Sequence, residues 1–288
     1  MKVDDSWVVL QRVRPAIKLI LAPRQGGAIR ELKWGNQDVL RPTPAEAGDD
    51  PFELACFPMV PYVNRIAHGR FNFGGHEVSL RPNWSADPHP LHGQGWRAPW
   101  SVVSASLSSA RLAFEGGGDE WPWRYRCEQS FELLDDGLLI ELSVESLSSE
   151  PMPAMLGFHP YFHDAVHAQL EAPLPRVWLT DATALPLEEA RTPAAWGFEP
   201  ARAVTGIALD HCFSGWSGTA VLRWPSLRLK LHAPECSFLH IYAPADKDFF
   251  CVEPQSAAAG ALGRQGEARI VAPGERFAIR VHLAAEST

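Results

Sequence analysis

The sequence has few cysteines, no long apolar run and no excess of basic residues. No apolar run reaches the roughly 18 residues of a membrane helix. Residues 1–5 (MKVDD) carry acidic groups where a signal peptide has its apolar core. No Cys-x-x-Cys pair occurs, so we expect free, buried or inert thiols in a reducing compartment and a cytoplasmic protein without a membrane segment. The five cysteines are Cys56, Cys127, Cys212, Cys236 and Cys251.

Basic residues are the minority among the charged ones. The 26 Lys and Arg against 34 Asp and Glu give a formal net charge of −8. Binding to a nucleic acid duplex needs a basic patch that displaces counterions, so we expect no nucleic acid partner. A Gly-x-Ser-x-Gly nucleophile elbow, a phosphate-binding glycine loop and a dinucleotide fingerprint are also missing.

Short apolar and β-branched runs predict strands along almost the whole chain. Examples are residues 6–11, 17–22, 101–114, 220–232 and 237–242, with further runs on both sides of the turn at 272–274. Residues 125–134 and 138–147 are separated by Asp-Asp-Gly, a strong hairpin signal. Only residues 186–191 and 256–262 look helical. The 25 prolines and 22 glycines leave little room for long helices, so we expect one all-β domain over residues 1–288, a mostly antiparallel sandwich.

Two glycine-containing segments in the first third of the chain concentrate polar groups. Residues 61–71 include Asn64 and Arg65, whose planar guanidinium can hold two oxygens at once unless it is simply a solvated strand-end charge. Residues 89–96 (HPLHGQGW) place His92 and Trp96 beside glycines that allow a ligand to approach the backbone. A metal site here is a weak alternative, because no acidic ligand is close in the sequence.

Two later segments offer an acid and a base. Residues 157–163 (GFHPYFH) contain His159, which we interpret as lying in a loop; on a helix, His159, His163 and His167 would share a face that suits a metal. Residues 249–255 (FFCVEPQ) deliver Glu253 after four apolar residues, and burial would raise its pKa toward the range of a general base. Asp210 is a weaker candidate of the same kind.

These segments, in this order, resemble the aldose 1-epimerase (galactose mutarotase) family. The matching motifs are NRIAHGRFNFGG at 64–75, HPLHGQGW at 89–96, HPYF at 159–162, LDHCFSGW at 209–216 and FCVEPQ at 250–255. Gly157-Phe158 stands where galactose mutarotases carry Asn and Thr, which resembles the divergent bacterial branch. The resemblance implies a β-supersandwich and interconversion of the α and β anomers of a free monosaccharide, with neither metal nor cofactor.

The resemblance also implies roles for individual residues. Glu253 would be the general base that removes the C1 hydroxyl proton, and His159 the general acid that protonates the ring oxygen. His92 would help to bind the ring or C1 oxygen. The substrate-binding residues would be Arg65, Asp210, Asn64 and Trp96.

Three alternatives remain at this stage. A hexose-6-phosphate 1-epimerase would use Arg65, Arg70 and Arg97 as a phosphate-binding cluster. A non-catalytic carbohydrate-binding protein could keep the fold, and a metal-dependent hydrolase could use the histidines. The sequence also leaves open whether the protein is a monomer or a homodimer, because edge strands can be protected or paired.

Overall fold

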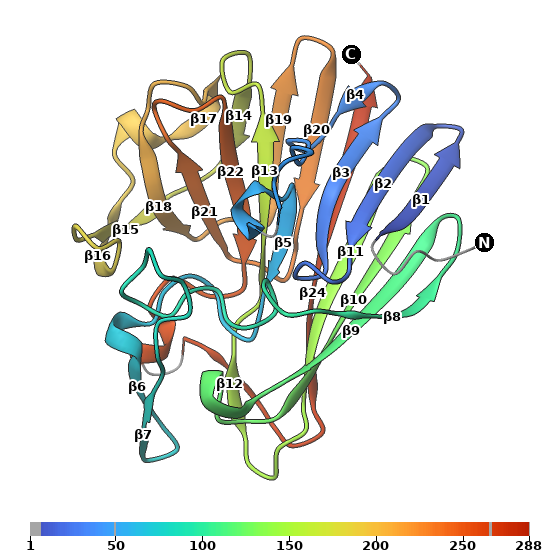
Figure 1. The fold of residues 1–288 in the computed structure, drawn as a ribbon. Coiled ribbons are helices and arrows are strands. Elements are labelled where there is room, and N and C mark those ends of the chain that lie inside the picture. Colours follow the sequence, from blue (N-terminus) through green and yellow to red (C-terminus); the bar gives the residue numbers. More distant parts are fainter. Residues whose placement is uncertain (1–6, 49, 265–266, 288) are drawn as a thin grey trace.

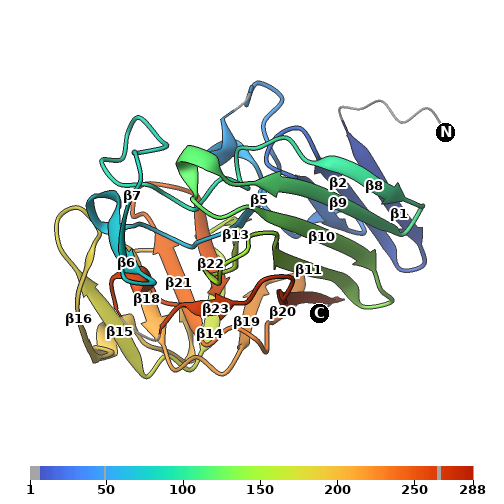
Figure 2. The same cartoon turned by 90° about the horizontal axis from the view of Figure 1, so that it is seen from below.

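The computed structural model describes residues 7–48, 50–264 and 267–287 and consists of two large antiparallel sheets packed face to face. Ser6 and residues 1–5 lie outside the described residues. Figures 1 and 2 show the two sheets as separate layers, with a small hairpin projecting at one end of the molecule. The predicted all-β, mostly antiparallel supersandwich is confirmed.

The first sheet has the order β1-β2-β3-β5-β13-β22-β21-β18-β15-β16, and β4 pairs with β3. Its strands are β1 Val8–Val13, β2 Ala16–Ala22, β3 Ala28–Trp34, β4 Gln37–Asp38, β5 Cys56–Met59, β13 Gly157–His163, β15 Arg176–Thr180, β16 Pro186–Arg191, β18 Leu209–Ser214, β21 Phe238–Ala243 and β22 Phe249–Gln255.

The second sheet has the order β17-β14-β19-β20-β24-β11-β10-β9-β8. Its strands are β8 Ser101–Ala105, β9 Ser109–Gly116, β10 Tyr125–Leu133, β11 Gly137–Ser146, β14 Gln169–Ala172, β17 Phe198–Ala203, β19 Thr219–Trp224, β20 Leu227–His232 and β24 Arg276–Ser287. The β10–β11 pair closes through the predicted Asp-Asp-Gly turn.

Small elements complete the fold. Two short sheets pair β6 Arg70–Phe73 with β7 His76–Ser79, the projecting hairpin, and β12 Met152–Ala154 with β23 Arg269–Val271. The described 3-10 turns are η1 Pro51–Glu53, η2 Ala67–Gly69, η3 Gly118–Glu120, η4 Ala194–Trp196 and η5 Ala261–Gly263. No helix in the described ranges has the length and apolar character needed to cross a bilayer.

The helical interpretation of residues 186–191 is wrong. They form the edge strand β16, which pairs with β15, and Glu189 accepts a hydrogen bond from Arg176 at 2.7 Å. Pairing at the sheet edge outweighs the local helix preference of Leu-Glu-Glu-Ala-Arg. Residues 256–262 form a turn instead of a helix, because Gly260 adopts a φ of +68° before the short η5 turn.

The loop interpretation of residues 157–163 is also wrong, because they form the central strand β13. Phe158 and Phe162 are buried, and Phe162 stacks on Phe250 of β22, while His159 and Tyr161 line a cavity. Both faces of the strand are therefore covered, so the sequence shows no alternation of polar and apolar residues. Pro160 lacks the N–H that a complete ladder uses, which explains the break in β13–β22 pairing between Gly157 and Tyr161.

One apolar core includes buried residues of both sheets. All five cysteines are buried and free, as the sequence predicts. Because the central strands β13 and β22 are anchored in this core by Phe162 and Phe250, the side chains on their opposite faces are held in fixed positions. These opposite faces carry the candidate site.

Candidate active site

The register of the neighbouring strands β13 and β22 brings the predicted acid and base together. Gly157 pairs with Gln255 and Tyr161 with Cys251, so His159 of β13 lies opposite Glu253 of β22. Glu253 in turn pairs with His240 of β21. The Nε2 atom of His159 lies 3.3 Å from Oε1 of Glu253, and both side chains are almost fully buried.

A second row of side chains runs beside the first on the same face. Tyr161, Cys251 and Tyr242 are cross-strand neighbours, and Tyr242 pairs with Asp210 of β18. Alternate residues of a strand point to one face, so both rows look toward the same side of the sheet. Side chains that lie far apart in the sequence thus form one polar surface.

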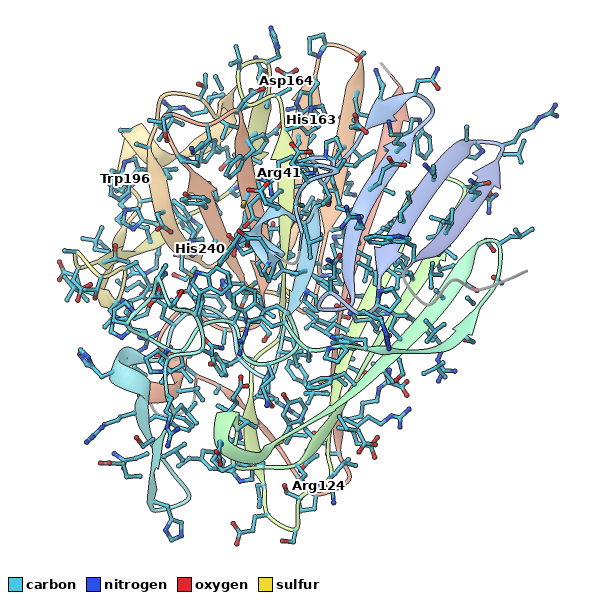
Figure 3. The ribbon with its side chains drawn as sticks, viewed as in Figure 1. Arg41, Arg124, His163, Asp164, Trp196 and His240 are labelled. Atoms are coloured by element: carbon cyan, nitrogen blue, oxygen red, sulfur yellow. The ribbon has the colours of Figure 1, made fainter. Side chains whose placement is uncertain are left out.

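This surface lines a cavity of about 530 Å³. Its walls combine ionisable and aromatic groups, with Arg41 and His240 lying over the middle of the first sheet (Figure 3). The lining residues are Arg41, Phe52, Glu53, Asn64, Arg65, Leu91, His92, His159, Tyr161, Asp210, His240, Tyr242, Lys247, Phe249 and Glu253.

Asn64 and His92 reach the cavity from two loops that hydrogen-bond to each other. The backbone N–H of His92 donates to the Asn64 carbonyl at 3.0 Å, and the Asn64 backbone N–H donates to His92 Nδ1 at 3.2 Å. Both residues have positive φ, 54° and 55°. Because Nδ1 accepts a hydrogen bond, the ring proton of neutral His92 is on Nε2, where it can donate to an oxygen.

Asp210 is connected to these loops through His240. The Nε2 atom of His240 lies 2.9 Å from Oδ1 of Asp210, and its Nδ1 atom lies 3.2 Å from Nδ2 of Asn64. The Asn64 side-chain oxygen accepts from the backbone N–H of Arg65 at 2.9 Å. Arg65 also pairs with Asp87 at 2.7 Å, which fixes its guanidinium beside the cavity.

Burial shifts the pKa values of His159 and Glu253 in opposite directions. Burial, as the largest cause, raises the pKa of Glu253 to about 7, although the nearby His240 acts to lower it. Burial, followed by the positive charge of His240, lowers the pKa of His159 to about 3. Both groups therefore favour their neutral forms, because an apolar environment penalises charge.

The flanking groups respond to charge as well as to burial. Burial lowers the pKa of His240, but the negative charge of Glu253 and the hydrogen bond to Asp210 outweigh it, so the pKa is raised well above its ordinary value. Burial also raises the pKa of Asp210, yet the hydrogen bond and charge of His240 bring it down to about 2. Asp210 accepts a hydrogen bond from His240 Nε2 at one wall of the cavity.

Trp96 does not occupy the predicted position. Its side chain is fully buried, and its Nε1 donates to the backbone carbonyls of Leu91 and Gly93. It packs behind the cavity against Phe57, which stacks on His159 at a ring distance of 4.5 Å. Trp96 therefore supports His159 through Phe57 without lining the cavity.

The predicted arginine cluster is not assembled. Arg70 lies exposed in the β6–β7 hairpin near Glu77, and Arg97 pairs with Glu120 at 2.9 Å. Neither lines the cavity, whereas Arg65 does. Closeness in the sequence was therefore a poor guide to the cavity lining, because only Arg65 of the three arginines lines the cavity.

The sequence interpretation missed Arg41 and His240. The Arg41 guanidinium lies 4.1 Å from the ring centre of Tyr161 and 4.6 Å from that of Phe249. Arg41 follows no recognisable motif, so no sequence signal identifies it. His240 could have been identified, because it is two residues from Tyr242 on a predicted strand and so points to the same face of the sheet.

The comparisons with known proteins agree with this geometry. Residues 19–284 match the family model described as aldose 1-epimerase. The chain belongs to the aldose 1-epimerase family.

Two Escherichia coli K12 comparisons and one clostridial structure illustrate the relationship. The uncharacterized protein YphB of Escherichia coli is 32% identical over 275 residues, covering 91% of this chain and 93% of its own. A crystal structure from the same strain, provisionally assigned as an aldose 1-epimerase, has a TM-score of 0.90 at 29% identity and covers 98% of this chain and 100% of its own.

A galactose mutarotase-like protein from Clostridium acetobutylicum shares the fold at lower sequence identity. Its TM-score is 0.86 at 19% identity, covering 99% of this chain and 100% of its own. Together, family and fold support a mutarotase-like carbohydrate epimerase, an isomerase that acts on a sugar.

Proposed function

We propose that this member of the aldose 1-epimerase family interconverts the α and β anomers of a free aldose by opening and closing the sugar ring. The observation that carries the proposal is the His159–Glu253 pair, 3.3 Å apart and buried beside a cavity rich in hydrogen-bonding groups. A carboxyl and an imidazole at this distance can act on the two oxygens attached to one carbon.

The proposed reaction consists of two proton transfers and one bond cleavage. Glu253 takes the proton of the C1 hydroxyl, the C1–O bond becomes a carbonyl, and the bond from C1 to the ring oxygen breaks. His159 gives a proton to that ring oxygen. Rotation about C1–C2 followed by the reverse transfers closes the ring on the other face, and no proton is gained or lost overall.

The pKa shifts indicate where the transferable proton rests before reaction. Because burial raises the pKa of Glu253 to about 7 and lowers that of His159 to about 3, the proton of the pair rests on the carboxyl. Passing it across the 3.3 Å contact to Nε2 produces the carboxylate base and the imidazolium acid together. The reactive form and the resting form therefore hold the same number of protons.

The remaining polar side chains suit the hydroxyls of the sugar. His92 can donate from Nε2 to the ring or C1 oxygen, Arg65 can donate to hydroxyl oxygens, and Asp210 can accept from hydroxyl groups. Asn64 positions both His92 and His240 through its hydrogen bonds. The proposed mechanism uses these groups without a metal or cofactor, and the buried free thiols favour a cytoplasmic setting.

A competition assay between phosphorylated and neutral sugars can identify the preferred aldose. Arg41 and Lys247 line the cavity, but Arg70 and Arg97 do not, so the arginine cluster of the phosphate alternative is not assembled among the described residues. We favour a neutral monosaccharide. If glucose 6-phosphate were turned over much better than glucose and galactose, the neutral substrate would be rejected.

Polarimetry of freshly dissolved α-galactose, α-glucose and α-glucose 6-phosphate tests the proposal. We expect the wild-type protein to accelerate relaxation for at least one sugar, and Glu253→Gln and His159→Ala each to lower kcat by about 10²- to 10⁴-fold. Glu188→Gln and His167→Ala change exposed groups away from the cavity and serve as matched controls. Sugar binding without any acceleration would instead identify a carbohydrate-binding protein, and unchanged turnover in Glu253→Gln would remove Glu253 from the mechanism.

A further inference from the structure

The thiol of Cys251 lies beside the catalytic pair, and the proposed mechanism does not use it. One ring nitrogen of His159, the Cys251 sulfur and one carboxylate oxygen of Glu253 all lie within 4.8 Å of one another, and all three residues are buried. Cys251 and Glu253 are two residues apart on β22 and so point to the same face. The three ligand atoms come from two neighbouring strands held rigidly by the core.

The spacing of these atoms suits a small tetrahedral cation. Zinc binds nitrogen and oxygen at about 2.0–2.2 Å and sulfur at about 2.3 Å, which places tetrahedral ligands about 3.3–3.7 Å apart. The 3.3 Å between His159 Nε2 and Glu253 Oε1 already matches this separation. The sulfur needs to move by at most about 1 Å toward the other two ligands.

The surroundings supply a route of entry and a free coordination position. His159 and Glu253 line the cavity, so a cation can reach them from that side and keep a water molecule as its fourth ligand. In addition, the Nδ1 atom of His159 is buried without a hydrogen-bond partner, and the ring is stacked on Phe57 and Tyr161.

We propose that His159, Cys251 and Glu253 form an inhibitory binding site for a thiophilic divalent cation such as Zn²⁺. On binding, the Cys251 S–H bond breaks and a zinc–sulfur bond forms, and both the thiol proton and the proton shared by Glu253 and His159 leave to solvent. The nitrogen and oxygen lone pairs that the proposed mechanism needs are then occupied by the metal. A sulfur ligand selects Zn²⁺ and Co²⁺ over Mg²⁺ and Ca²⁺, which prefer oxygen ligands.

Co²⁺ is the direct probe, because a cobalt–thiolate bond gives a charge-transfer absorption in the near ultraviolet. We expect this absorption in the wild-type protein with one equivalent of Co²⁺, its displacement by Zn²⁺, and its loss in Cys251→Ser. Cys127→Ser is the matched control, since Cys127 is an equally buried free thiol in the other sheet, and it keeps the absorption. Mg²⁺ produces no competition.

Titration calorimetry with Zn²⁺ provides a second measurement, made on variants that retain the Cys251 thiol. We expect Glu253→Gln and His159→Ala each to weaken Zn²⁺ binding at least about tenfold. Equal Zn²⁺ affinity in wild type and Cys251→Ser would place the ion at exposed histidines and overturn the proposal. Absence of the cobalt absorption in the wild type would overturn it as well.

The inhibitory effect, but not the metal site, rests on the proposed function. Zn²⁺ should slow mutarotation by the wild type and Cys127→Ser at least tenfold more than by Cys251→Ser, and a chelator should restore the rate. A metal-free wild type without mutarotase activity would reject the proposed function, while the cobalt spectra would still decide the metal site. Full activity of zinc-loaded wild type would reject inhibition.

Discussion

At the scale of single residues, the site depends on a carboxyl group that burial keeps close to neutral. Glu253 is 1% exposed and lies between His159 on one neighbouring strand and His240 on the other. Burial raises its pKa, while the positive charge of His240 limits the rise, so the carboxyl can both hold and release a proton near neutral pH. An exposed glutamate would be a weaker base because its pKa lies near 4.3.

The pH dependence of catalysis should reflect the proton shared by this pair. The pair holds one proton between the His159 pKa of about 3 and the Glu253 pKa of about 7, and loses it above about 7. We expect kcat/KM to be level from about pH 5.5 to about pH 7 and then to fall about tenfold per pH unit. Polarimetry with the buffer rate subtracted measures the profile. A rate that rises steadily through this range would contradict the shared-proton mechanism.

Removing the Glu253 charge should stabilise the protein at alkaline pH. The folded pKa is raised above the ordinary value of 4.5, so the contribution of this group to stability is fully present below that value and lost as pH rises through about 7. Glutamine cannot ionise and avoids this loss. We expect the Tm advantage of Glu253→Gln over wild type to be about 2–6 °C larger at about pH 8 than at about pH 5.5. Equal differences at both pH values, measured by calorimetry, would argue against a buried titrating carboxyl.

At the scale of elements, the strands supply the proposed acid and base, and the loops complete the candidate site. β13 and β22 hold His159 and Glu253 at fixed register. His92 instead lies in a loop whose next residue, Gly93, forms an isolated β-bridge with Val60. Gly93 has a φ of +75°, and a Cβ there would lie 2.2 Å from the Val60 carbonyl oxygen. The loop can follow this path only because the residue after His92 is glycine.

Gly93→Ala should therefore destabilise the protein and displace His92. Gly74→Ala is the matched control, because Gly74 also has positive φ (+60°) but a Cβ there meets nothing within 4 Å. We expect a loss of about 1 kcal/mol in the control and about 2–4 kcal/mol for Gly93→Ala, with reduced turnover only in the latter. Urea unfolding and polarimetry measure both effects. Equal losses of stability would show that backbone strain, not the contact with Val60, decides the outcome.

At the scale of the whole molecule, two sheets share one core, and the cavity lies on the outer face of the first sheet. A larger groove, of about 1160 Å³, is lined by Arg124 and residues of the β6–β7 hairpin, and Figure 3 places Arg124 at the far end of the molecule from Arg41 and His240. The cavity next to the central strands is therefore the place where the predicted residues converge. Whether the protein is a monomer or a homodimer stays a prediction.

The shared core predicts that the chain unfolds as one unit. Buried residues of both sheets belong to the same cluster, so neither sheet can lose its partner without exposing its own apolar face. We expect one urea transition with the same midpoint by near-ultraviolet circular dichroism and by tryptophan fluorescence. Two separated transitions would contradict the prediction of a single domain over residues 1–288.

The sequence by itself determined the all-β class, the Asp-Asp-Gly hairpin and the ordered motifs around Asn64, His92, His159, Asp210 and Glu253. These features are local, because turn residues and strand runs are encoded over a few positions. Only the tertiary structure decided that His159 lies on a strand, that His240 and Arg41 join the site, and that Trp96 lies behind it. The reason is physical: the register between strands distant in sequence determines which side chains meet, and a single sequence carries no direct signal of that register.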